Sequence, residues 1–194
     1  MRLHREIFAI CSTFLTGLFL LSPSLLAQEF IAPEQITKFG RTYKLAYTKI
    51  VPNGQAIYEY TANNESIENW TALVTFNYRK GFNIDPIKWT SALKASLDAH
   101  KPRPHYKLYA TDKNGYARFI FEPDRSNLTY ESNIHKSFHA EACGGLLVLQ
   151  YAAKYPKDRD NLSSEKLSTL ISIREENEKI SVQMEHDDWV PACQ

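Results

Sequence analysis

The sequence predicts an α+β fold, an antiparallel β-sheet with two main helices. Several short runs alternate apolar and polar residues, as half-buried strands do, and turn-forming residues separate them. Two longer segments repeat their apolar residues at helical spacing instead. Because strand-like and helix-like segments do not alternate regularly along the chain, an antiparallel sheet is favoured over a parallel one.

The first expected elements are the strands of a β-hairpin at residues 42–50 and 55–61. Both runs are rich in Tyr and in β-branched or apolar residues, and a Pro-Asn-Gly sequence between them is typical of a turn. A third strand is expected at residues 69–78, where apolar residues occupy alternate positions. These three segments indicate that the sheet begins near residue 41.

A helix is expected at residues 86–99. Asp85 is a capping residue, Pro86 suits the first helical position, and two further prolines follow soon after the segment ends. Apolar residues recur at helical spacing and form one face of this helix, and we expect that face to cover one face of the sheet. The residues of this face are Trp89, Leu93 and Leu97.

The second half of the chain predicts four more strands and a final helix. Asn114-Gly115 is typical of a hairpin turn between the first two of these strands, and Gly144-Gly145 of a turn between the last two. An amphipathic helix should begin near Ser163. The four strands are expected at residues 105–111, 116–121, 130–142 and 146–153.

The N-terminus has the pattern of a secretory signal peptide at residues 1–27. Two arginines precede an apolar run of about 15 residues, which is shorter than a transmembrane helix, and Ala27 is a small residue suited to cleavage. We therefore expect a periplasmic protein, with secretion as the alternative, and no membrane span once the signal is removed. Residues 28–40 are expected to form a leader, and residues 41–194 a single α+β domain. An uncleaved anchor remains an alternative, because Leu25 is only an acceptable residue at its position before the cut.

The cysteine count predicts one disulfide. Cys11 lies within the expected signal peptide, so Cys143 and Cys193 alone remain in the exported chain. Thiols tend to oxidise outside the cytoplasm, and a bond between these two would tie the C-terminal residues to the domain. Two free thiols are the alternative.

Charge and motifs exclude several classes of function. The formal net charge is +1 and the basic residues are scattered, so no nucleic-acid partner is expected. His139-Ala140-Glu141 matches half of the zinc deaminase signature, but the second half is missing. His135 and His139 would stand about 13 Å apart along a strand, too far to share a metal ion. We therefore expect no catalytic residues, no cofactor and no metal site.

The order of the elements, together with the stretches ESIENWT at residues 65–71 and GLLVLQY at residues 145–151, resembles the PsbP-like or DcrB-like sandwich over residues 41–184. This resemblance implies a mostly non-catalytic protein that docks on membrane complexes or acts as an adaptor or chaperone. Some exported bacterial proteins of similar size are periplasmic accessories to envelope machines, including type VI secretion systems.

The leading hypothesis is a non-enzymatic periplasmic accessory or adaptor protein that binds an envelope complex. Support of the assembly of a type VI secretion system is one form of this hypothesis. One alternative is a small-molecule or lipid-binding protein with a cleft between sheet and helix. Another is a hydrolase whose site is not visible in sequence, centred on His135, His139 and Glu141. Aromatic residues carry much interface energy, so a protein partner is expected to contact Trp70, Tyr78, Phe82 and Trp189.

Overall fold

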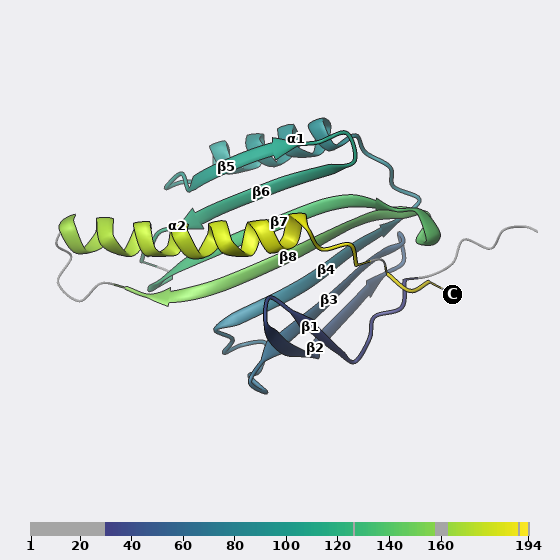
Figure 1. Cartoon of the computed structure of the whole chain (residues 1–194), viewed down its shortest axis with the longest axis horizontal. Helices are drawn as coiled ribbons and strands as arrows, with labels where there is room; N and C mark the ends of the chain where they lie inside the picture. Colours follow the sequence, from purple (N-terminus) through teal and green to yellow (C-terminus); the bar gives the residue numbers. More distant parts are fainter. Residues whose placement is uncertain (1–29, 126, 158–162, 190, 194) are drawn as a thin grey trace, which may run out of the picture.

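A computed structural model describes residues 30–125, 127–157, 163–189 and 191–193, so the expected signal peptide lies outside the described residues. Figure 1 shows a twisted sheet with one helix across its near face. In the described part of the chain there are eight strands, two α-helices and one short 3-10 turn. Their bounds are β1 Gln35–Lys38, β2 Arg41–Val51, β3 Gln55–Ala62, β4 Ala72–Lys80, α1 Pro86–Ala99, β5 His105–Ala110, β6 Asn114–Phe121, β7 Thr129–Ala140, the 3-10 turn Glu141–Cys143, β8 Gly145–Pro156 and α2 Ser163–Glu185.

All eight strands belong to one sheet in the order β1-β2-β3-β4-β8-β7-β6-β5. Every neighbouring pair is antiparallel. The predicted α+β class with an antiparallel sheet and two main helices is therefore confirmed. No helix of the described residues is both long and apolar enough to cross a membrane.

The two helices pack on opposite faces of the sheet, because successive residues of β6 point to opposite sides. Ala117 and Phe119 face α1, where they pack with Leu97 and with the half-buried Trp89 and Leu93. The predicted packing face of α1 is confirmed. On the other side of β6, Ile120 packs in a cluster with Ile173 of α2.

The largest core lies on the α2 side of the sheet and is closed by the two ends of the described chain. Phe30 is buried there, and Trp189 stacks on Phe76 with ring centroids 4.7 Å apart. Phe30 also forms an antiparallel bridge with Cys193, which is joined to Cys143 in a disulfide with Cα atoms 5.4 Å apart. The C-terminal tail thus covers aromatic residues of the sheet.

Two expectations for the fold need correction. Residues 30–40 are not a leader outside the domain, since they include β1 and the buried Phe30. Gly115 is not in a turn but inside β6, opposite Ala110. A Cβ atom at this position would lie 2.6 Å from the Oγ of Ser137 and 2.7 Å from the ring of Trp89. Glycine is therefore required here by the close approach of α1 to the sheet.

The packing of α1 predicts a large loss of stability for Leu97→Ala. Leu97 is only 4% exposed, so the substitution leaves a cavity that should lower the free energy of unfolding by about 2–5 kcal/mol in urea titrations. Ile87→Ala is the matched control, because Ile87 lies on the same helix but is 65% exposed. Equal effects of the two substitutions would contradict the assigned packing face.

The disulfide predicts a stability that depends on reducing agent. It closes a loop of 50 residues, for which loss of chain entropy in the unfolded state is worth roughly 4 kcal/mol. Dithiothreitol should lower the urea midpoint of the wild type toward that of the variant carrying Cys143→Ala and Cys193→Ala, and should leave the variant unchanged. A wild-type midpoint insensitive to reductant would show that the bond does not form.

Candidate functional site

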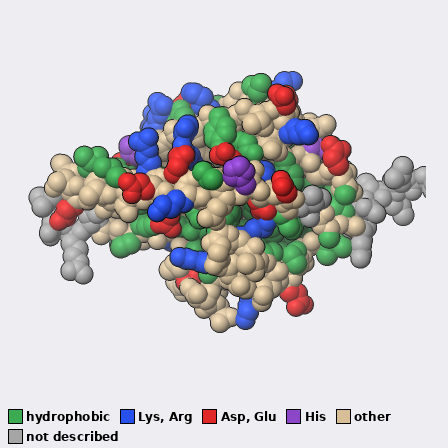
Figure 2. All heavy atoms as spheres, in the orientation of Figure 1, with side chains coloured by type: hydrophobic (Ala, Val, Ile, Leu, Met, Phe, Trp, Pro, Cys, Tyr) green, Lys and Arg blue, Asp and Glu red, His purple; other side chains and the backbone are tan. Residues whose placement is uncertain are grey.

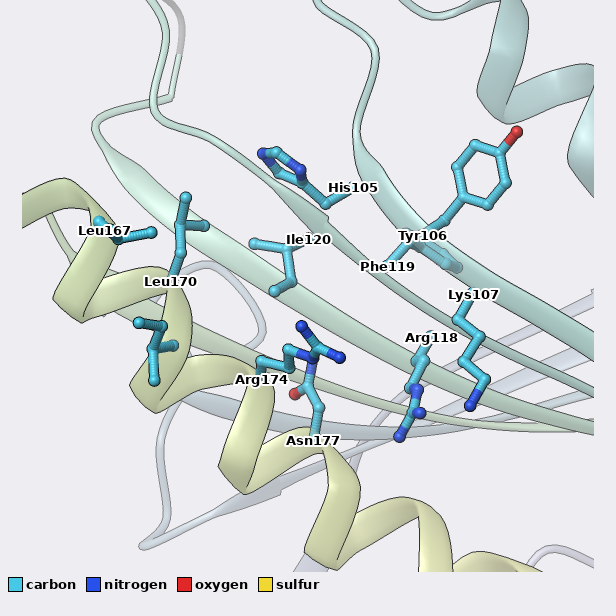
Figure 3. Close-up of a pocket in the computed structure, with 11 residues that line it drawn as sticks. His105, Tyr106, Lys107, Arg118, Phe119, Ile120, Leu167, Leu170, Arg174 and Asn177 are labelled. Atoms are coloured by element: carbon cyan, nitrogen blue, oxygen red, sulfur yellow. The ribbon is translucent and has the colours of Figure 1, made fainter. Parts of the chain in front are cut away.

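A cleft of about 540 Å³ opens between α2 and the strands β5 and β6 (Figure 3). Its volume lies within the range of small-molecule binding sites, roughly 300–1,000 Å³. One wall is the N-terminal half of α2, and the other is the face of β5 and β6 turned away from α1. The cleft is therefore built by segments that lie about 50 or more positions apart in the sequence.

The floor of the cleft is apolar. Ile120 points into it from β6, and Figure 3 shows Leu170 of α2 facing Ile120 across the opening. Leu167 and Ile171 line the same wall and are 60% and 48% exposed. When a ligand covers large apolar side chains in a concave site, each Å² of apolar surface removed from water contributes about 25 cal/mol to binding.

Ion pairs between α2 and the sheet bound the cleft at both ends. At one end the carboxylate of Glu122 lies 2.5 Å from the Nζ of Lys166 and 2.7 Å from the Nε2 of His105. Burial tends to raise the pKa of Glu122, but the hydrogen bonds from Lys166 and His105 outweigh it and lower that pKa. At the other end Arg118 of β6 pairs with Glu178 of α2.

The charges that remain at the rim are positive. Lys107 and Arg174 both line the cleft, and neither forms a hydrogen bond or ion pair with any residue that the structure describes. Lys107 also lies directly opposite Arg118 in the register of β5 and β6. Figure 2 shows Lys and Arg side chains beside hydrophobic ones over this part of the molecule. Since like charges in directly opposed positions are destabilising, an anion between them would be favourable.

Hydrogen bonds join the C-terminal half of α2 to the sheet, and the N-terminal half of α2 forms a wall of the cleft. The buried Lys136 of β7 donates hydrogen bonds to the carbonyl oxygens of Met184 and Asp187, at 3.0 and 2.9 Å. Burial lowers the pKa of Lys136. About two turns earlier in the helix, the hydroxyl of Ser132 donates to the buried Asn177. These contacts fix the height of α2 above the sheet.

The four aromatic residues expected at a protein interface do not form one surface. Tyr78 is buried, and its hydroxyl donates to the carbonyl oxygen of Cys143 at 2.6 Å. Trp189 is half-buried against Phe76. Trp70 and Phe82 are also half-buried, but they lie before and after β4 and so at its opposite ends. Two of the four thus belong to the core on the α2 side.

The histidines considered for a hydrolase site lie away from this cleft. His135 faces the α1 side, where its ring lies edge-on to Phe119 with centroids 4.9 Å apart. His139 lines a separate polar cleft with Asp85 near the start of α1, and its Nε2 stands 3.9 Å from Glu141. Across the described ranges, no three or more His, Cys, Asp or Glu residues are grouped closely enough to hold a metal ion.

A protein-family model matches residues 30–189. The chain belongs to this family. The match spans every strand and both helices, so the cleft is formed wholly within the family's own region of the chain. No curated protein and no solved structure gives a significant match to the chain.

Sequence reasoning did not find the residues of the cleft. Lys107, Arg118 and Arg174 are separated in the sequence and lie among other charges, so nothing marks them as neighbours. The one available signal is in α2. Its buried stripe includes Ile173 and Ile180, whereas Leu167 and Ile171 lie outside that stripe. Exposed apolar residues outside the buried stripe of a helix indicate that a second face of the helix binds a ligand or a partner.

The environment of His135 predicts a pH-dependent stability. Burial lowers its pKa to about 4, from an ordinary value of 6.5. Between these values the unfolded chain binds the proton more readily than the folded one, so stability is lost as the pH falls through this window. The loss from this group should reach about 2 kcal/mol between pH 7.5 and pH 5.

Urea titrations of the wild type and of His135→Gln at both pH values measure this difference. Gln does not titrate, so the variant should lose about 2 kcal/mol less than the wild type over the same interval. The same loss in both proteins would show that His135 is not shielded from water in the folded state.

Proposed function

We propose that this protein is a non-enzymatic accessory protein of the cell envelope that acts by binding, and that the cleft between α2 and β5–β6 is its binding site. The observation that carries the proposal is the combination found in that cleft. Exposed apolar side chains lie in a concave site together with two cationic side chains that have no hydrogen-bond or ion-pair partner among the described residues. Such a combination is typical of ligand sites, which are mostly apolar with a few polar groups that orient the ligand.

The way the cleft is built also supports a binding role. The positions of its walls are fixed by the ion pairs at both ends. They are also fixed by the hydrogen bonds that join the C-terminal half of α2 to the sheet. A site formed by packed elements needs little reorganisation when its ligand enters, which lowers the entropic cost of binding. The planar guanidinium group of Arg174 offers several N–H donors in a fixed geometry, which suits recognition of a carboxylate or another anion.

An adaptor that docks on a protein of an envelope complex is the second candidate. Leu167, Ile171 and Val182 lie along one side of α2, and Val182 is 46% exposed. Apolar residues in a row on an exposed helix face are typical of a protein interface. We infer the same candidate from the resemblance to the PsbP-like or DcrB-like sandwich, which rests on the order of the elements and carries the expected periplasmic location and the link to secretion machines.

Site-specific photo-crosslinking in the cells that make the protein tests the proposed site. A photoreactive amino acid placed at Leu167 or Ile171 should form adducts, because both side chains face the cleft and are accessible. The same group at Ile87, an exposed position on α1, is the matched control and should give few or none. Mass spectrometry of the adducts measures the outcome.

The mass of the adduct also separates the two candidates. A small adduct supports ligand binding, and a protein adduct supports an adaptor. Adducts at position 87 as abundant as those at positions 167 and 171, or no adducts at the latter two, would overturn the proposed site.

A further inference from the structure

The length and volume of the cleft limit what it can hold. Between the two ion-pair bridges, from Lys166 to Glu178, α2 rises about 18 Å at 1.5 Å per residue. A partner helix of that length and about 10 Å in diameter would occupy roughly 1,400 Å³. The cleft offers about 540 Å³. A helix could be seated only in part, whereas a single slender chain fits along the floor.

The part of the floor formed by β6 offers few backbone groups to a ligand, whereas β5 beside it is the edge strand of the sheet. β6 pairs with β5 from Gly115 to Ile120 on one side and with β7 along its whole length on the other. The facing segment of α2 lies within a continuous helix, whose N–H and C=O groups bond to each other. An extended peptide lying over β6 and under α2, away from the outer edge of β5, would bury its own backbone groups without partners, which is costly. A hydrocarbon chain has no such groups.

The rim selects an anion. The two carboxylates at the ends of the cleft are already taken, Glu122 by Lys166 and His105, and Glu178 by Arg118. Lys107 and Arg174 remain without a partner among the described residues. Arg118 adds further positive charge beside Lys107. Figure 3 shows the side chain of Arg174 reaching from α2 toward the floor. An acid group held here would offset charges that otherwise repel each other.

From this geometry we propose that the cleft binds an anionic amphiphile with one hydrocarbon chain, a molecule of the fatty-acid type. The inference rests on the proposed function and names the ligand class of the same site. The hydrocarbon chain lies along Ile120, Leu170, Leu167 and Ile171, and the carboxylate lies between Lys107 and Arg174. A purely polar anion would leave the floor in water, and a neutral hydrocarbon would leave the cations unpaired.

Isothermal titration calorimetry with sodium dodecanoate, below its micelle concentration, tests the ligand class. The wild type should bind dodecanoate at least tenfold more tightly than dodecanol and more tightly still than dodecyltrimethylammonium, because the three probes share a chain and differ in head-group charge. Equal affinity for dodecanoate and dodecanol would overturn the assignment of the cationic rim.

Variants separate the two parts of the site. Lys107→Gln combined with Arg174→Gln should lower dodecanoate affinity at least tenfold and leave dodecanol affinity unchanged. Lys49→Gln combined with Lys88→Gln removes two exposed charges elsewhere and should change neither. Ile171→Glu should weaken binding of both probes. Dodecanoate affinity that survives the loss of Lys107 and Arg174 would contradict the proposed position of the carboxylate.

A second readout distinguishes recognition from a structural role. Without ligand, Lys107→Gln removes the repulsion with Arg118, so its urea midpoint should be equal to or above that of the wild type. A lower midpoint would mean that Lys107 supports the fold. Absence of dodecanoate binding, when the cleft positions still give photo-crosslinks, would overturn the ligand class and leave the proposed binding site standing. Absence of both would overturn the proposed function itself.

Discussion

The position of α2 depends on one buried ammonium group. Lys136 lies on the α2 side of β7 and is removed from water, so its charge requires partners. It finds them in the carbonyl oxygens of Met184 and Asp187, at and just beyond the end of the helix, where carbonyl groups lack helical partners and the helix dipole favours a cation. Asp187 is itself held by an ion pair with Lys38. The C-terminal end of α2 is thus fixed to the sheet, and its N-terminal half packs over β6 through Ile173 and Leu170, beside the ion pair of Lys166 with Glu122.

The alternation of side chains along β6 connects this arrangement to the binding site. The odd-numbered residues of β6 support α1, and the even-numbered ones, Arg118 and Ile120 among them, face α2. One strand therefore supplies the floor of the cleft and one of its ion-pair bridges while its other face completes the packing of α1. Because its backbone is paired on both sides, the part of the floor formed by β6 presents mainly side chains, and the chemistry of the cleft is set by a few residues.

Capping residues, turn residues and apolar periodicity were sufficient to predict most helices and strands. Features that depend on contacts between distant segments could not be predicted from the sequence. Asp85 caps α1 by accepting hydrogen bonds from the backbone N–H groups of Ile87 and Lys88, as its position before Pro86 suggested. By contrast, β1 has only four residues and gains its stability from pairing with β2, so no local pattern marks it. The glycine of Asn114-Gly115 was assigned to a turn because its requirement for close packing against Trp89 depends on a helix distant in sequence.

The same reason explains why the site was not predicted. Lysine side chains are rarely buried, and only the tertiary structure shows that Lys136 is buried and which carbonyl groups it contacts. His135 was considered in the sequence as part of a hydrolase site, but its ring packs edge-on against Phe119. Lys107 and Arg174 line the same cleft only because α2 lies over β5 and β6. Charge complementarity at a cleft between distant segments cannot be inferred from spacing within either segment.

The most direct test of the central claim is methyl NMR on protein labelled at isoleucine, titrated with sodium dodecanoate. The molecule contains its own controls, since Ile120 and Ile171 line the cleft, whereas Ile50 and Ile87 are exposed elsewhere. Binding in the cleft should shift the methyl signals of Ile120 and Ile171 in a saturable way and leave those of Ile50 and Ile87 in place. Shifts spread evenly over all four, or confined to Ile50 and Ile87, would contradict the assignment of this cleft as the binding site.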